Sequence, residues 1–304
     1  MGIKIKIYWI KFVAWLGTVL SMLVYNFHKH IKGVKSINNI KYKKDGNRFN
    51  KFDIHYKEQD FLDGKKSPIL IYFHGGGWTN YSKHIFTTLT RRIADMGVVV
   101  FNCNYSLSPK YKQEDVLSDA MEAVKHACKI AHKFGGDSSK ILFGGDSAGA
   151  HMSAMLQVYA NQNKNGFGKF KDKIKGLVLF YGVYNLNTAL TSKFPKIREY
   201  ISATIHSKIG TIESEKEMQK YSPATYDLNG FAPCFLASGA VDKLHKSQSY
   251  EFSKLLTQNN IKHKNVFFDD TEYKAMHAFM IIDGIDTNVK VLNELKKFID
   301  GVKE

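Results

Sequence analysis

The chain has 304 residues, 44% of them hydrophobic, which is enough for one large α/β domain or two small ones with a real core. Its three cysteines, Cys103, Cys128 and Cys234, are scattered and odd in number, which argues against a disulfide framework or a metal site. The formal net charge is +16, and residues 1–51, with eleven Lys/Arg and one acid, carry +10 of it. Because this charge lies beside an apolar segment, it indicates a membrane surface rather than a nucleic-acid partner.

The apolar segment at the N-terminus is long enough to cross a bilayer core. Residues 12–27 are uncharged, and with Lys11 able to extend toward the interface the span covers residues 7–27. Residues 27–30 contain no small-residue cleavage pattern, so an uncleaved anchor is favoured over a signal peptide. We expect residues 1–35 to form a single-pass membrane anchor with a basic flank. An amphipathic helix lying on the body of the protein is the alternative. Lysines on both flanks leave the orientation open.

The rest of the chain, residues 36–304, alternates strand-like and helical patterns. Residues 37–43 and 49–57 alternate apolar and polar side chains around Asp45-Gly46-Asn47, which predicts an antiparallel pair at a sheet edge. Apolar runs predict buried strands, and 3.6-residue periodicity predicts helices at 114–134, 247–258 and 288–300. The strands are expected at 69–73, 97–103, 141–143, 175–181, 233–239 and 262–268. This order predicts an α/β fold with a parallel sheet covered on both faces.

Residues 184–231 interrupt the alternation. They contain no clear strand, and 197–205 and 213–221 have the pattern of short helices. An insertion that follows a parallel strand lies over the carboxyl ends of the strands, where ligands bind in open α/β sheets. We expect this segment to be a small cap.

The sequence Gly145-Asp146-Ser147-Ala148-Gly149 has the form G-x-S-x-G. It follows the apolar run 141–143, and apolar residues recur at helical spacing after it, so the motif is expected at a sharp strand-to-helix turn. Such a turn exposes the serine hydroxyl at the end of the sheet and directs the next backbone N–H to the same point. Because glycine and serine are common, the pentapeptide alone is also compatible with an ordinary turn.

A second motif, His74-Gly75-Gly76-Gly77-Trp78, follows the expected strand at 69–73. Consecutive glycines allow several backbone N–H groups to approach a ligand closely, and such an array stabilises a negative charge on a carbonyl oxygen. A flexible turn is the alternative. We expect His74 to orient the loop rather than to react.

A serine nucleophile requires a base and an acid that orients the base. Of twelve histidines, the positions leave His245 and His277, and His277 lies in the loop between the last strand and the last helix. For the acid we expect Asp242, which follows the strand at 233–239, with Asp269 and Asp270 as the alternatives. Chain order Ser, acid, His favours Ser147, Asp242 and His277. Asp146 is expected to point away from the serine.

These motifs together resemble the hormone-sensitive-lipase-like and carboxylesterase branch of the α/β-hydrolase superfamily. The residues that carry the resemblance are 74–78, 145–149, Asp242 with its loop, 277–279, and the Tyr-x-Leu-x-Pro stretch within 104–109, although Lys110 stands where the branch often has an acid. The resemblance implies an eight-stranded, mostly parallel sheet with helices on both faces. It also implies an oxyanion hole formed by Gly76, Gly77 and Ala148, supported by His74 and Gly75.

The sequence therefore predicts a membrane-anchored serine carboxylic-ester hydrolase that needs no metal or cofactor and acts on a small-molecule or lipid ester. One alternative keeps the same three residues but cleaves an amide, as an amidase, a formamidase or a deacetylase. The other is a non-catalytic, membrane-tethered protein with a hydrolase fold.

Overall fold

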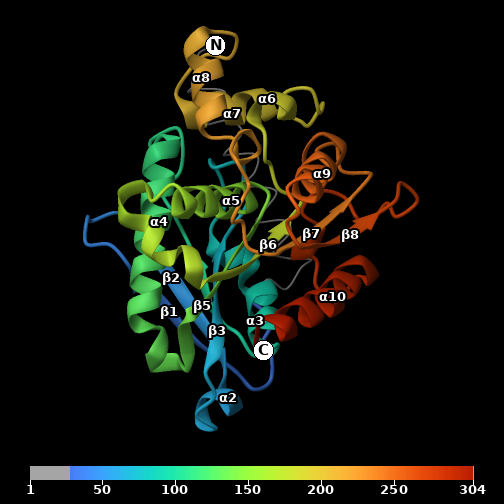
Figure 1. Ribbon diagram of the computed structural model, residues 1–304. Coiled ribbons are helices and arrows are strands. Elements are labelled where there is room, and N and C mark those ends of the chain that lie inside the picture. The colour runs from blue at the N-terminus through green and yellow to red at the C-terminus, as the bar shows by residue number, and fades with distance from the viewer. Residues whose placement is uncertain (1–27, 304) are drawn as a thin grey trace.

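The computed structural model describes residues 28–303, which form one eight-stranded sheet in the order β1-β2-β4-β3-β5-β6-β7-β8 (Figure 1). β2 is antiparallel to both of its neighbours, and every other pair is parallel. The strands are β1 Val34–Lys41, β2 Lys51–Lys57, β3 Ser67–Phe73, β4 Val99–Cys103, β5 Gly136–Asp146, β6 Ile174–Phe180, β7 Cys234–Gly239 and β8 His263–Phe268. The predicted mostly parallel sheet and its antiparallel edge pair are confirmed.

Helices cover both faces of this sheet, as expected. The larger are α3 Thr87–Asp95, α4 Gln113–Ile130, α5 Ala148–Asn161, α9 Glu251–Gln258 and α10 Asp286–Lys303. The shorter are α2 Glu58–Leu62, η1 Lys83–Phe86, η2 Ala131–Phe134, η3 Lys164–Lys173, η5 Lys246–Tyr250 and η6 Phe279–Ile281. α4, α5 and α9 pack on one face of the sheet, and α3 and α10 pack on the other.

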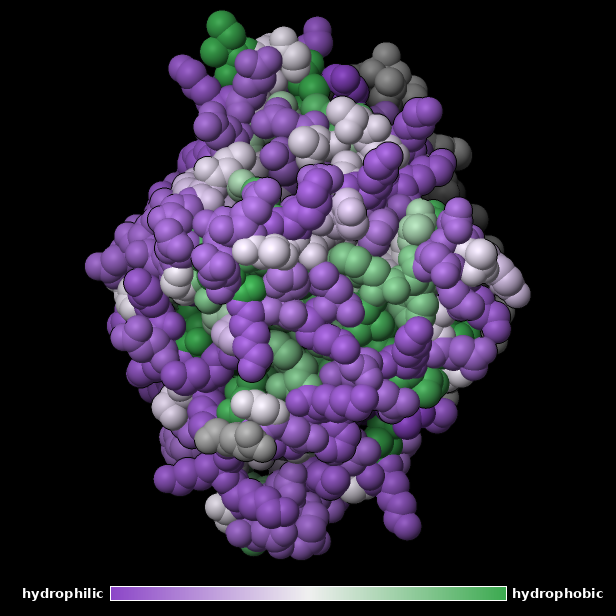
Figure 2. All heavy atoms as spheres, turned by 45° about the vertical axis from the view of Figure 1, so that its right-hand side comes forward, coloured by the Kyte–Doolittle hydropathy of each residue, from purple (hydrophilic) through white to green (hydrophobic). Residues whose placement is uncertain are grey.

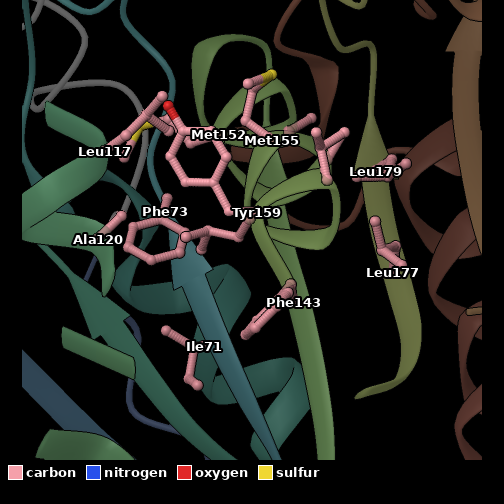
Figure 3. Packing of buried hydrophobic residues seen from close by; sticks show 14 of the residues in the cluster. Ile71, Phe73, Leu117, Ala120, Phe143, Met152, Met155, Tyr159, Leu177 and Leu179 are labelled. Carbon is pink, nitrogen blue, oxygen red and sulfur yellow. The ribbon is translucent and has the colours of Figure 1, made fainter. Parts of the chain in front are cut away.

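The alternation of side chains along a strand explains the two-sided core. In β3, Ile69, Ile71 and Phe73 belong to the cluster under α4 and α5, whereas Leu70 and Tyr72 face α3 and α10. Figure 3 shows the first cluster, in which Phe73 and Phe143 lie beneath Met152 and Tyr159 of α5. All seven residues of β3 are buried, which is why the sequence shows a continuous apolar run there.

β5 and α3 are two of the elements that differ from the expectation. β5 begins at Gly136 rather than near 141, because its polar first residues still pair with Ser67 and Pro68 of β3. α3 was not anticipated, because three of its nine residues are threonines, which have low helix propensity. Its buried face, which includes Leu89, Ile93 and Ala94, supplies the stability that its local sequence lacks.

The segment between β6 and β7 is helical and contains no strand. It comprises α6 Leu186–Ala189, α7 Ile197–Ile205, α8 Ile212–Lys220 and η4 Pro223–Thr225. In Figure 1 α6, α7 and α8 lie together at the top of the molecule, beyond the ends of the strands. This placement is the one expected of a cap.

The expected anchor at residues 7–27 lies outside the described residues. Between residues 28 and 303, every helix is too short or too polar to cross a membrane. The face drawn in Figure 2 is largely hydrophilic, and its apolar side chains lie in hollows framed by hydrophilic ones.

Candidate active site

Ser147 lies at the turn between β5 and α5 in a strained backbone conformation, with φ 49° and ψ −115°. The turn is possible because its flanking glycines allow an unusually close approach of the chain. A Cβ on Gly149 would lie 1.9 Å from the carbonyl oxygen of Phe73, and one on Gly145 would lie 2.5 Å from the same oxygen. The pairing of Phe73 with Gly145 thus brings the end of β3 against the serine turn.

The structure brings the three predicted residues Ser147, His277 and Asp242 together. His277 Nδ1 lies 2.7 Å from Asp242 Oδ2, and His277 Nε2 lies 3.0 Å from Ser147 Oγ. An ionised carboxylate only accepts hydrogen bonds, so Nδ1–H donates to Asp242 and the bare Nε2 accepts from the serine hydroxyl. This is the tautomer that a histidine base requires.

Asp242 is held rigidly for this contact. Its side chain is 1% exposed, and its other carboxylate oxygen accepts the backbone N–H of Leu244 at 2.9 Å. The alternatives, Asp269 and Asp270, are exposed, and Asp269 instead accepts from the N–H and hydroxyl of Thr271. Of the three candidate acids, Asp242 is therefore the one whose carboxylate contacts His277.

The other candidate base, His245, is not at the serine. Its Nδ1 lies 2.6 Å from the hydroxyl of Ser238, and its ring packs edge-on against Phe267. His151 lies behind the serine turn, where Nδ1 accepts from the Trp78 indole at 3.3 Å and Nε2–H donates to the carbonyl of Tyr221 at 2.6 Å. Burial lowers the pKa of His151 to about 4, so it stays neutral.

The glycine loop follows β3 directly. Gly76 and Gly77 have φ of +118° and +58°, a region that favours glycine, and Trp78 continues with φ 59°. Within residues 28–303, the N–H groups of Gly76, Gly77 and Ala148 have no protein acceptor. A negatively charged oxygen could use these donors.

His74 supports this loop and does not contact the serine. Its buried ring stacks on Tyr105, with 4.3 Å between ring centroids, and Tyr105 donates its hydroxyl hydrogen to the His74 carbonyl at 2.7 Å. Burial lowers the pKa of His74 to about 4, so the imidazole is neutral and Nδ1–H donates to the carbonyl of Gly75. Tyr105 lies in the motif at 104–109, and its contact with His74 is a detail that the motif alone did not reveal.

Asp146 turns its carboxyl group away from the serine, as expected, but its partners were not anticipated. Its Oδ1 accepts the backbone N–H of Gly75 at 2.8 Å and the hydroxyl of Tyr72 at 3.2 Å. Complete burial raises the pKa of Asp146 to about 7. The residue before the serine therefore holds the first glycine of the loop. Its position in the pentapeptide was the only sequence signal for this role.

Two aromatic residues from the segment between β6 and β7 reach the site. The ring of Phe194 lies 4.7 Å from that of His277, measured between centroids, in an edge-to-face arrangement. Tyr200, on α7, covers Gly77 so closely that a Cβ there would lie 2.8 Å from its ring. Neither contact could be predicted, because the packing of the segment is not encoded in a local pattern.

The side chains gathered at the site are those of a serine hydrolase. In the described part of the chain, no three His, Cys, Asp or Glu side chains are grouped so that they could hold a metal ion. A serine on a left-handed turn after a parallel strand, hydrogen-bonded to a histidine that a buried aspartate holds, is the arrangement of the α/β hydrolases.

Comparison with known proteins agrees with this class. The family model described as alpha/beta hydrolase fold matches residues 70–280, which include every candidate site residue, and the chain belongs to this family. The resemblance to the hormone-sensitive-lipase-like carboxylesterases is thereby confirmed.

Among the curated relatives, esterase LipQ of Mycobacterium tuberculosis is 28% identical over 218 residues, which cover 69% of this chain and 50% of the relative. The probable isoprenylcysteine alpha-carbonyl methylesterase ICMEL1 of Oryza sativa is 27% identical over 215 residues, covering 66% and 49%. The match thus spans about half the length of these relatives.

Solved structures share the fold. Esterase B from Lactobacillus rhamnosis superimposes with a TM-score of 0.82 at 15% identity, covering 98% of this chain and 95% of that one. A hyperthermophilic esterase from Pyrobaculum calidifontis gives a TM-score of 0.70 at 21% identity, covering 99% and 94%.

Proposed function

We propose that this protein is a serine carboxylic-ester hydrolase that acts through an acyl-enzyme on Ser147. The observation that carries the proposal is the continuous hydrogen-bonded chain from Asp242 through His277 to Ser147, with the serine on a strained, accessible turn. The family and the relatives named as esterases favour an ester over an amide as the scissile bond.

In the first half of the reaction, Ser147 Oγ attacks the ester carbonyl carbon while His277 Nε2 takes the hydroxyl proton. Asp242 stabilises the imidazolium that forms. The negative oxygen of the tetrahedral intermediate accepts hydrogen bonds from the N–H groups of Gly76, Gly77 and Ala148. The intermediate collapses, the carbon–oxygen bond of the ester breaks, and the alkoxide leaves with the proton from His277.

In the second half, water attacks the acyl-enzyme and gives its proton to the same His277 nitrogen. A second tetrahedral intermediate forms and releases the carboxylic acid, and His277 returns the proton to Ser147. No other proton carrier is needed, because one histidine serves both halves. The role of His74 and Gly75 is to hold the glycine loop in place.

Labelling with a fluorophosphonate probe tests the proposal. The intact chain should be labelled, Ser147→Ala should not, and His277→Ala should be labelled far more slowly. A folded wild-type chain that resists labelling would instead support a non-catalytic hydrolase-fold protein. A nitrophenyl ester and the matching nitroanilide, assayed in parallel, separate ester hydrolysis from amidase, formamidase or deacetylase activity.

We also propose that the N-terminal part of residues 1–35 anchors the protein as a single-pass segment and that 36–304 belong to the catalytic domain, with 184–231 as its cap. The catalytic domain starts slightly earlier than the expected boundary, because β1 begins at Val34. The support is the uncharged run at 12–27 between lysines. A membrane location would suit lipophilic esters. Extraction of membranes at alkaline pH should leave the full chain in the pellet, and release into the supernatant would contradict an integral anchor.

A further inference from the structure

A groove at the end of the sheet opposite Ser147 combines an apolar floor with a lysine-rich rim. Its volume is about 680 Å³. Residues of β5, β6 and β8 line it, together with the residue before β7 and the last turns of α10. It lies at the amino ends of the parallel strands, whereas Ser147, Asp242 and His277 follow carboxyl ends, so a ligand there would not occupy the catalytic site.

The floor of the groove consists of apolar side chains that the core does not fully cover. Ile174 is buried, and Pro233, Phe298 and Val302 remain half-buried. Phe298 is fixed in place, because its ring lies 5.7 Å from that of Phe235 and packs closely over Gly176. This surface can accommodate a hydrocarbon chain of a ligand.

The rim carries five lysines and one acid, Glu294. The acid is already neutralised, because Glu294 lies 2.5 Å from Lys297 and 2.9 Å from Lys264. These two contacts lower the pKa of Glu294 to about 2, so it stays ionised and paired at neutral pH.

The three remaining lysines have no carboxylate partner among residues 28–303. The ammonium groups of Lys140 and Lys175 donate to the backbone carbonyls of Lys303 and Asp172, and that of Lys262 has no hydrogen-bond acceptor within the described chain. A groove lined by one sign of charge concentrates ions of the opposite sign. The groove therefore offers unbalanced positive charge beside a hydrocarbon-binding floor.

We propose that this groove binds an anionic amphiphile, a single apolar chain with a carboxylate or phosphate head. The head lies between Lys175 and Lys262, and the chain lies over Phe298 and Val302. Such a molecule could come from solution, as a free long-chain carboxylate, or from a membrane surface, as an anionic lipid. The inference does not depend on Ser147 chemistry.

The structure provides two independent ways to disrupt the groove. Lys175→Glu/Lys262→Glu reverses the charge at the two rim positions proposed for the head group, and Lys41→Glu/Lys44→Glu, at the opposite edge of the sheet, changes the net charge equally. A Cβ on Gly301 would meet nothing within 4 Å, so Gly301→Trp should fill the groove without a clash, and Gly301→Ala is its matched control.

The experiment is photolabelling of the full chain in neutral phosphatidylcholine nanodiscs with a diazirine-tagged long-chain carboxylate, followed by mapping of the labelled peptides. We expect label on α10 residues that line the groove. This label should fall about fivefold or more with the rim reversal and with Gly301→Trp, and should be unchanged in the two controls. The corresponding uncharged alcohol should label this peptide several-fold less.

A second arm places the same tag on the single acyl chain of an anionic lysophospholipid within the nanodisc. Labelling only in this arm, with the same sensitivity to the variants, would support the groove and assign its ligand to the membrane surface. Labelling of α10 that is equal in wild type and both groove variants, or equal for the alcohol, would overturn the proposal. Esterase activity is read separately with a short soluble ester, so failure of the groove and failure of the proposed function are distinguishable.

Discussion

The carboxyl group of Asp146 accepts a hydrogen bond from the backbone N–H of Gly75 at 2.8 Å. This contact joins the residue before the nucleophile to the first glycine of the loop that supplies the proposed oxyanion donors. It depends on β3 and β5 being neighbours in the sheet, with Phe73 paired to Gly145. The buried side chain of Asp146 therefore couples the loop position to the serine turn.

Loss of this contact should slow catalysis without removing the nucleophile. We expect Asp146→Ala to lower kcat by about 10- to 100-fold, somewhat less than the loss of an oxyanion donor itself, because the loop is displaced rather than deleted. Asp146→Asn keeps an oxygen acceptor for the Gly75 N–H, so its kcat should fall much less. Initial rates with a nitrophenyl ester measure both, and equal rates for Asp146→Ala and wild type would show that the loop is held by other contacts.

The same carboxyl group should make stability depend on pH. Burial raises the pKa of Asp146 to about 7, whereas in the unfolded chain it is near 3.8. Between these values the folded state binds the proton more tightly, so the free energy of unfolding falls as pH rises and becomes constant above about pH 7. From pH 5 to pH 8, ionisation of Asp146 should lower the free energy of unfolding by about 2–3 kcal/mol.

Urea unfolding of wild type and Asp146→Asn at pH 5 and pH 8 isolates this effect. The comparison with the variant is needed because burial lowers the pKa of His74 and His151 to about 4, and these histidines add stability as pH rises toward 6.5. The amide introduced by this substitution cannot titrate, so the variant should gain stability relative to wild type between pH 5 and pH 8. A difference between the two proteins that does not change with pH would show that Asp146 does not titrate in this range.

Asp242→Asn should nearly abolish turnover while leaving the fold intact. An asparagine side chain carries no charge to stabilise the imidazolium and can hold His277 in the wrong tautomer, which lowers kcat by about 10⁴ in related triads. Asp269→Asn is the matched control, because Asp269 is exposed and contacts Thr271 instead of His277. Steady-state rates with circular dichroism as a check on folding distinguish loss of chemistry from loss of structure.

Gly149→Ala should damage the serine turn. The added methyl group would lie 1.9 Å from the Phe73 carbonyl oxygen, so β3 or α5 must move, and we expect a loss of several kcal/mol in unfolding free energy. Gly301→Ala, also a helical glycine but facing open space, should be neutral or stabilise by about 0.5–1 kcal/mol. Thermal unfolding of both variants gives the comparison, and similar midpoints would contradict the close approach.

The sequence predicted the parts of the site that depend on local patterns. Ser147 and the glycine loop could be placed because each follows an apolar run that had to be a buried strand. His277 was preferred to His245 because it lies in the loop between the last strand and the last helix. In the structure the two histidines have different partners, since His245 contacts Ser238 and His277 contacts Ser147 and Asp242. The fold class followed from the alternation of strands and helices.

The parts that could not be predicted depend on contacts between distant segments. The partners of the Asp146 carboxyl group depend on the register of β3 with β5, and no pattern within either strand specifies that register. Tyr200 reaches Gly77 only because α7 folds back over the strand ends. α3 was missed because its threonines disfavour a helix locally. Burial of one face of α3 stabilises the helix in the folded protein.

A buried ion pair that no motif indicated should be important for stability. Lys83 is fully buried, and its Nζ lies 2.7 Å from both carboxylate oxygens of Asp53 on β2. Lys83→Met would leave Asp53 charged and buried, with the N–H of Asn39 as its one remaining close donor among residues 28–303, so the unfolding free energy should fall by about 3–5 kcal/mol.

Replacing both partners, as Lys83→Met/Asp53→Leu, should recover much of this loss, because the penalty comes from the unpaired charge rather than from the absent attraction. Lys254→Met, which breaks the exposed pair with Glu251, is the control and should change stability by less than about 0.5 kcal/mol. Chemical denaturation of the four proteins measures these differences. A double variant no more stable than Lys83→Met would mean that Lys83 acts through the backbone contacts of its turn, where its N–H donates to Asn104 Oδ1 and its carbonyl accepts from Asn102, rather than through its charge.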